Sequence, residues 1–237
     1  MVPLRIMWSL GVLLFQYMTG SVVSLRLFNG KRMILFPGSE VSSMFLYTDI
    51  PDKEEIMVLR RLATPDTIFL DIGAHIGSYS ICLMDKVKKI IAFEPFPQIA
   101  QRCRMNFIYN NVPVGNVEQI GISAINGNVR FTTDKGETEN HIATSRKNTI
   151  TIKSSTLDTY VKRKKMSKRN SYLIKIDVEG GEIEVVKGAM QFFRDYAIDA
   201  IVYESFGKQA VQMENLLKSI GFTIRNISEH NYYATKN

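Results

Sequence analysis

The chain has 237 residues, of which 45% are apolar, and its formal charge is +7. This length suits one large domain or one domain with an extension, and the composition, without internal repeats, excludes a disordered or repeat protein. The excess of Lys and Arg suits a negatively charged partner such as nucleic acid, a membrane surface or a phosphorylated carrier, but a basic surface without such a role fits equally well. Two cysteines, Cys82 and Cys103, are too few for a disulfide framework and indicate core residues in a reducing compartment.

Residues 1–20 are predicted to form an apolar helix. Residues 6–15 are almost wholly apolar and follow Arg5. They fit the core of a signal peptide, a membrane-associated segment extending over residues 6–23, or a helix packed on the domain. If the segment inserts, the basic residues that follow it weakly favour a cytoplasmic body. We therefore expect a cytoplasmic protein, with membrane association through residues 6–23 as an alternative to the packed helix.

Residues 21–65 are predicted to form a hairpin followed by a helix. Two β-rich runs, 22–28 and 32–36, are separated by Asn29-Gly30, which is a strong hairpin signal. A helix is predicted over residues 52–62, before Pro65.

Residues 66–237 alternate between apolar strands and amphipathic helices. Strands are predicted at 67–71, 89–93, 117–120, 129–133, 149–153, 172–177, 198–204, 222–227 and 232–234, and helices at 78–86, 97–110, 182–194 and 209–220. This order predicts an α/β fold with a mostly parallel, doubly wound sheet that ends in an antiparallel C-terminal edge strand. Such sheets bind ligands outside the carboxyl ends of their strands.

Three of these strands end in an acidic residue: Asp71, Glu94 and Asp177. A fourth strand ends at Glu204. A carboxylate at the end of a buried strand is costly unless it is paired or faces a ligand. Several of them at one sheet edge therefore predict a binding site.

The first of these strands continues into a glycine loop with Gly73 and Gly77. Such a loop lets the backbone approach a ligand, but the spacing is not that of a dinucleotide fingerprint, and Asp71 would repel a pyrophosphate. A cationic cofactor without phosphate, S-adenosylmethionine (AdoMet), fits better. Glu94 follows Asp71 by 23 residues (94 − 71), near the separation at which an acid receives ribose hydroxyls.

Five segments resemble the FkbM-type methyltransferases, in order over residues 26–204. They are FLDIGAHIGSYS, IAFEPFP, NFIYNNV, STLDTYV and YLIKIDVEGGEIEVVKGA, of which IDVEGGE is the most specific. The resemblance implies a Rossmann-like class I methyltransferase fold, AdoMet as cofactor, and usually O-methylation of hydroxyls on sugars, glycolipids or polyketide-type natural products. The resemblance also implies that the cofactor contacts Asp71, Gly73, Gly77 and Glu94, and that Asp177 faces its methyl end.

The resemblance has two departures, at His75 and Phe96. His75 stands where asparagine is common in the family, and Phe96 replaces a more polar residue. His75 is still expected to contact the cofactor, although the hydrogen bonding of the loop is then in doubt.

Methyl transfer to a hydroxyl is helped by a base that removes the proton. Asp177 and Glu179 lie at a suitable strand end, and His141, in the polar segment ENHIATS, is another candidate. Capping of a helix N-terminus is the alternative role for these carboxylates and the favoured one for Glu182. No Cys/His cluster has the spacing of metal ligands, so no metal is expected.

The densest charge on the chain is KRKKMSKR, residues 162–169. It fits either a contact for phosphate groups or a solvated loop, and without interleaved aromatic residues it does not indicate stacking on single-stranded nucleic acid. The expected acceptor is a hydroxylated small molecule, glycan or glycolipid. Methylation of RNA and a non-catalytic nucleotide-binding module are the alternatives, the second disfavoured by the intact loop residues.

Overall fold

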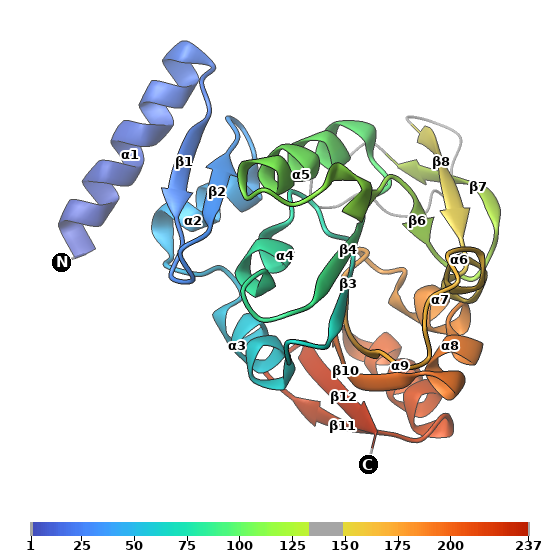
Figure 1. The fold of residues 1–237 in the computed structure, drawn as a ribbon. Helices are drawn as coiled ribbons and strands as arrows, with labels where there is room; N and C mark the ends of the chain where they lie inside the picture. The colour runs from blue at the N-terminus through green and yellow to red at the C-terminus, as the bar shows by residue number, and fades with distance from the viewer. Residues whose placement is uncertain (1, 133–148, 237) are drawn as a thin grey trace.

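A seven-stranded sheet forms the centre of the molecule in this computed structural model, which describes residues 2–132 and 149–236 (Figure 1). The strand order is β11-β12-β10-β9-β3-β4-β5, and the pairs β10–β9, β9–β3, β3–β4 and β4–β5 are parallel. The strands are β3 (Ile68–Ile72), β4 (Lys89–Phe93), β5 (Val117–Glu118), β9 (Ser171–Ile176), β10 (Ala197–Glu204), β11 (Phe222–Asn226) and β12 (Asn231–Lys236). The predicted α/β fold with a mostly parallel sheet is confirmed.

The antiparallel strand is β12, and it lies one position in from the edge. It pairs antiparallel with β10 on one side and with β11 on the other. Helix α9 (Gly207–Ser219) carries the chain outward, so that β11 becomes the edge strand. The short turn after Asn226, closed by Ile227 N–H on the carbonyl of Asn231 at 2.8 Å, then returns β12 next to β10. A turn this short joins only antiparallel neighbours.

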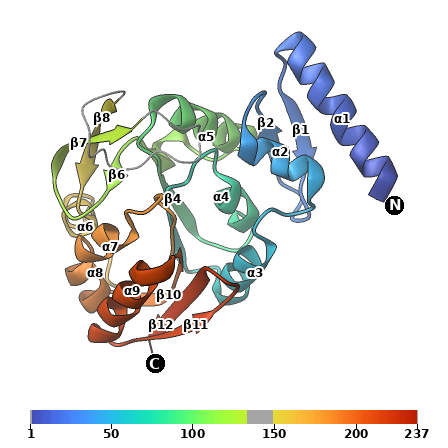
Figure 2. The same cartoon turned by 180° about the vertical axis from the view of Figure 1, so that it is seen from behind.

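Helices cover both faces of the sheet (Figures 1 and 2). The sequence of strand β3 is continuously apolar because both of its faces are buried. Phe69 packs into the core on one face of the sheet, and Ile68 and Leu70 pack into the core on the other. The first face carries α2 (Glu40–Tyr47), α3 (Lys53–Leu62), α4 (Ser78–Leu83) and α5 (Pro97–Tyr109), and the second carries α6 (Leu157–Arg163), α7 (Glu182–Lys187), α8 (Met190–Asp195) and α9.

The predicted hairpin is present as β1 (Val23–Arg26) and β2 (Arg32–Leu35). It is held on α5 by two asparagines of the NFIYNNV segment. Asn106 Oδ1 accepts from the N–H of Ile34 at 2.7 Å, and Asn110 Oδ1 accepts from the N–H of Arg32 at 2.9 Å. Asn106 also donates to the carbonyl of Ile76 at 3.0 Å. The hairpin is therefore tied directly to the glycine loop.

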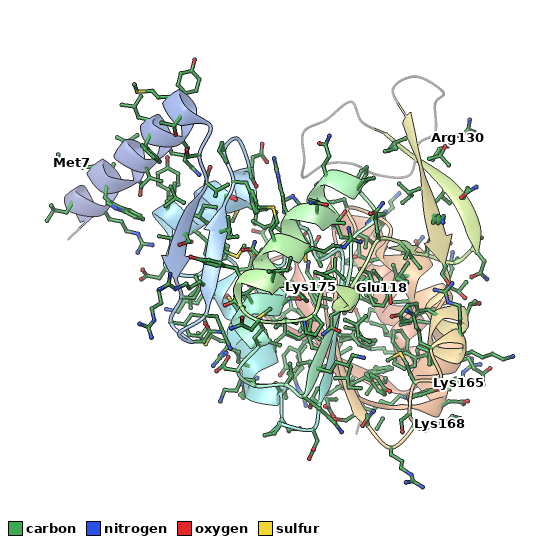
Figure 3. All side chains as sticks on the ribbon, turned by 45° about the horizontal axis from the view of Figure 1, so that its top comes forward. Met7, Glu118, Arg130, Lys165, Lys168 and Lys175 are labelled. Atoms are coloured by element: carbon green, nitrogen blue, oxygen red, sulfur yellow. The ribbon has the colours of Figure 1, made fainter. Side chains whose placement is uncertain are left out.

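The N-terminal helix α1 (Val2–Thr19) packs on β2 and α2. Ser9 donates to the carbonyl of Leu46 at 2.7 Å, and Gln16 donates to the carbonyl of Leu35 at 2.9 Å. Its outer side is apolar and exposed, as Met7 shows in Figure 3. No helix within residues 2–132 and 149–236 is long and apolar enough to cross a membrane.

The helix predicted over residues 182–194 is two helices, α7 and α8, because the chain is held from outside at the break. The carboxylate of Asp158, in the STLDTYV segment, accepts from the N–H groups of Gln191 and Phe192 at 3.1 and 2.7 Å and so caps α8. Gly188 packs against the chain at Ser123, whose carbonyl oxygen would lie 2.1 Å from an added Cβ.

A second, three-stranded sheet lies beside the first, in the order β6-β8-β7. It contains the two strands predicted around residues 129–153, and its strands are β6 (Gly121–Ile122), β7 (Gly127–Thr132) and β8 (Thr149–Ser155). A 3-10 turn, η1 (Val114–Asn116), precedes β5. The chain from β5 to β6 runs along the carboxyl edge of the main sheet and supplies part of the site described below.

Candidate cofactor and acceptor site

The glycine loop joins β3 to α4 at the carboxyl edge of the sheet. Gly73 has φ +81°, and an added Cβ would lie 1.7 Å from the carbonyl oxygen of Asp177. Only glycine permits this close approach between the ends of β3 and β9. Gly77 has φ +89° and begins α4, where an added Cβ would crowd Cys103 Sγ at 3.1 Å. Gly73 thus brings two strand ends together, and Gly77 lets α4 pack on α5.

Glu94 orders the loop from the end of β4. One carboxylate oxygen accepts from the N–H of His75 at 3.0 Å, and the other accepts from the N–H of Phe96 at 2.9 Å. Burial raises the pKa of Glu94 to about 7, against the opposing effect of these two hydrogen bonds. The carboxylate is therefore fixed in orientation while it lines the cavity.

His75 adopts a left-handed backbone conformation, with φ +50°. Its ring lines the cavity, and neither ring nitrogen has a hydrogen-bond partner among the described residues. Burial, with a further contribution from the charge of Lys175, lowers the pKa of His75 to about 4. The imidazole is neutral at neutral pH and leaves two polar atoms for a ligand to satisfy.

Asp71 is fully buried and does not line the cavity. One carboxylate oxygen accepts from the N–H and the hydroxyl of Ser80 at 3.2 and 2.6 Å, and the other has no partner among the described residues. Burial raises the pKa of Asp71, while the charge of Lys175 opposes the shift. Asp71 and Gly77 thus support the cavity from behind, whereas Gly73, His75 and Glu94 line it.

Lys175, which the sequence analysis did not single out, is the centre of the site's electrostatics. Its ammonium group lies 2.8 Å from the carboxylate of Asp177 and 3.2 Å from the carbonyl oxygen of Gly73, and 4.6 Å from the ring centre of Tyr79. Burial alone would lower the pKa of Lys175, but Asp177 and Asp71 raise it overall. The lysine stays charged and lies in the middle of the molecule (Figure 3). The sequence did contain one signal for this role, because Lys175 lies two residues before Asp177, the aspartate at the strand end.

The IDVEGGE segment forms the loop between β9 and α7. Glu182 accepts from the N–H groups of Val178 and Gly180 at 3.0 and 3.1 Å, so this carboxylate closes the loop as well as starting the helix. Glu179 has φ +56°, and burial, Asp177 and Glu204 raise its pKa to about 7. The loop thus holds Asp177 and Glu179 beside the cavity.

The cavity lies between these elements and has an apolar and an acidic part. Phe93, Phe96, Ile99 and Ile122 line the part beside Glu94, and Asp52, Asp177 and Glu179 line the other. Lys175 is the one charged basic side chain of the described residues that lines it, and this lysine is paired with Asp177. Such a donor set suits an adenosine bearing a cationic group and is unsuited to a pyrophosphate. The residues therefore fit AdoMet.

Two expectations concern residues or groups away from this cavity. His141 lies outside the described residues. Within residues 2–132 and 149–236, no three His, Cys, Asp or Glu side chains are grouped to hold a metal ion.

The fold and this cavity define an α/β protein with a site for an adenosine-type cofactor at the carboxyl ends of its strands. The model of the methyltransferase FkbM domain matches residues 71–232, and the chain belongs to this family of AdoMet-dependent methyltransferases. The hexuronic acid methyltransferase AglP of Haloferax volcanii is 27% identical over 156 residues, which are 65% of this chain and 63% of that protein. The chain thus matches less than two thirds of this relative's length.

Solved methyltransferases align with this chain at low similarity. The tRNA m1G37 methyltransferase of M. jannaschii aligns with 91% of this chain and 57% of its own, at 11% identity and a TM-score of 0.49. The precorrin-6y C5,15-methyltransferase of Geobacter metallireducens aligns with 77% of this chain and 86% of its own, at 15% identity and a TM-score of 0.45. At these scores, neither likeness bears on the substrate.

Proposed function

We propose that the protein transfers a methyl group from AdoMet to a hydroxyl of a sugar, glycolipid or related natural product. The observation that carries the proposal is the meeting of Glu94, Gly73 and Asp177 around one cavity, with Lys175 bound to both Gly73 and Asp177. Family membership supports methyl transfer, and the relative named as a hexuronic acid methyltransferase supports a sugar acceptor.

In the proposed mechanism, Glu94 and the glycine loop bind and orient the cofactor. The Glu94 carboxylate would accept hydrogen bonds from the ribose hydroxyls, and the apolar side chains beside it would cover the adenine. The cofactor supplies an electrophilic methyl group on a sulfonium. Alignment of donor and acceptor by these groups contributes up to about 7–11 kcal/mol to lowering the barrier.

Asp177 is the proposed base. Its carboxylate accepts the proton of the acceptor hydroxyl, and Lys175, 2.8 Å away, holds this carboxylate in position. Glu179, on the same loop, is the second candidate. The proposed catalytic unit is residues 66–237, with residues 21–65 covering the glycine loop through Asn106.

The basic run at residues 162–169 does not support an RNA acceptor at this site. Lys164 and Lys165 line a separate groove with Lys88 and Lys89, at the amino ends of the strands, and Figure 3 shows Lys165 and Lys168 well away from Lys175. Two of these lysines are paired, Lys164 with Glu118 and Lys168 with Asp195.

Labelled AdoMet, incubated with the purified protein and fractionated cell extract, tests the proposal. Label in glycan, glycolipid or a hydroxylated small molecule is the expected result. Label that enters RNA would contradict the hydroxyl acceptor, and absence of transfer to any fraction would contradict an active methyltransferase.

A further inference from the structure

A second cavity adjoins the cofactor cavity on its acidic side. Six residues line both cavities: Met44, Asp52, Tyr79, Lys175, Asp177 and Glu179. Beyond this shared wall, the second cavity extends along β10 and β12 to Tyr203, Glu204 and Asn231. Asp177 belongs to the shared wall, so a molecule in the second cavity can reach it, as an acceptor must do.

Charges in the second cavity are strongly one-sided. Five carboxylates line it, from Asp52, Glu55, Asp177, Glu179 and Glu204, and Lys175 is the one basic side chain of the described residues among them. The lysine is already bound to Asp177 and to the Gly73 carbonyl, with its side chain only 6% exposed. It is therefore not free to pair with an incoming anion.

Glu204 and Glu179 differ from the other carboxylates of this cavity because they have no partners in the part of the chain that the structure describes. Neither makes a hydrogen bond or ion pair with another described residue, whereas Glu55 contacts the hydroxyl of Ser228 at 3.3 Å. Glu204 is half-buried at the end of β10, opposite Asn231 in the pairing register. The strand fixes its backbone, and its carboxylate can accept hydrogen bonds from a ligand.

We propose that Glu204, with Glu179, determines specificity by accepting hydrogen bonds from acceptor hydroxyls and by repelling acceptors whose methylated unit is negatively charged. This inference rests on the proposed function. Carboxylates accept charge-assisted hydrogen bonds from hydroxyls, and an anion beside them would be left without a partner. The chemistry therefore fits a neutral polyol, or one bearing an amine, and disfavours a uronate.

The charge of the labelled product tests this inference directly. Product labelled from AdoMet in cell extract is hydrolysed to its units, and the labelled unit is separated by electrophoresis at neutral pH. A unit that stays at the origin or moves as a cation is expected; one that moves as an anion overturns the inference. If the labelled unit is uncharged but is not a sugar, the result contradicts the sugar acceptor and leaves the charge selection standing. If the labelled unit is a uronate, the result contradicts the charge selection and leaves the sugar acceptor standing.

Kinetics with the isolated acceptor test the residue. Glu204→Gln should raise KM for the acceptor about tenfold or more, the scale of a hydrogen bond to a charged group, while kcat changes less than about threefold. Glu229→Gln, on a side chain that is 87% exposed outside the cavity, is the matched control and should leave KM unchanged. Calorimetric binding of S-adenosylhomocysteine verifies that both variants are folded. A KM for Glu204→Gln within twofold of wild type would overturn its role.

Discussion

The ammonium group of Lys175 lies 2.8 Å from the carboxylate of Asp177 and joins the two halves of the site. Through its second contact, with the carbonyl of Gly73, the lysine connects the end of β9 to the cofactor loop after β3. It also compensates the fully buried charge of Asp71. Geometry and charge in the site therefore depend on one side chain.

Replacing Lys175 should destabilise the fold as well as the site. Lys175→Met leaves Asp71 and Asp177 without their counter-charge, and loss of one partner of a buried pair costs about 3–5 kcal/mol. Because the Asp177 side chain is 34% exposed, we expect about 3 kcal/mol, measured by urea unfolding. Lys187→Met, which removes an exposed pair with Glu184, should cost less than about 1 kcal/mol. If both variants lost the same free energy of unfolding, the buried pair would be no more stabilising than the exposed one.

Gly73 is predicted to be irreplaceable for steric reasons. An added Cβ would lie 1.7 Å from the Asp177 carbonyl oxygen, so Gly73→Ala must separate β3 from β9 at the cavity. We expect at least about 3 kcal/mol of destabilisation and loss of AdoMet binding in calorimetry. Gly115→Ala, where no atom lies within 4 Å of the new methyl group, is the control. Unimpaired AdoMet binding by Gly73→Ala would refute the described loop.

Cofactor choice depends on Glu94. We expect AdoMet to bind and NAD not to bind, and Glu94→Gln to weaken AdoMet binding by about 1.5–3 kcal/mol through loss of charged hydrogen bonds to the ribose. Glutamine keeps an oxygen for one of the N–H groups of His75 and Phe96, so the loop is disturbed less than by alanine. Glu118→Gln, on β5 outside the cavity, is the control. Tighter binding of NAD than of AdoMet would reject the assignment.

Stability of the free protein should depend on the protonation of Glu204. Burial, together with the charges of Asp177 and Glu182, raises the pKa of Glu204 to about 7, and Asp52 adds a smaller increase. The charge of Lys175 opposes this shift. Glu204 in turn raises the pKa of Glu179. Because the folded state holds the proton of Glu204 more tightly than the unfolded state, stability falls as pH rises from about 4.5 to 7.

Glu204→Gln removes this penalty. It should therefore raise the Tm by roughly 2 °C at pH 8 and by less at pH 5, measured by calorimetry without ligand. An increase that is the same at both pH values would show that ionisation of Glu204 has no part in the effect.

Much of the fold could be predicted because its signals are local. Apolar runs marked the buried strands, and Asn29-Gly30 marked the hairpin. The break between α7 and α8 was missed although Gly188, which ends α7, is a local signal for it; the capping of α8 by Asp158, a residue on another helix, could not be predicted. The place of β12 inside the sheet likewise follows from the path of the chain and not from its own sequence.

The site divides in the same way. Strand-end acids and glycines indicated its location, and Gly73, Glu94 and Asp177 do line the cavity. The sequence could not show that Asp71 turns toward Ser80, because both orientations are compatible with a strand-end acid. Nor did it single out Lys175, because its contact with the Gly73 carbonyl and its charge interaction with Asp71 depend on the pairing of β9 with β3.

The rate of methyl transfer by Asp177→Asn, at saturating AdoMet and on the true acceptor, tests the central claim most directly. Loss of a general base typically costs about a hundred- to ten-thousand-fold, so we expect turnover to fall at least about a hundredfold, with AdoMet affinity changed by less than about tenfold. Glu182→Gln, which keeps an oxygen for the N–H groups of Val178 and Gly180, should change turnover far less at matched stability. Near wild-type turnover by Asp177→Asn would contradict the account and leave Glu179 as the remaining base candidate on the IDVEGGE loop.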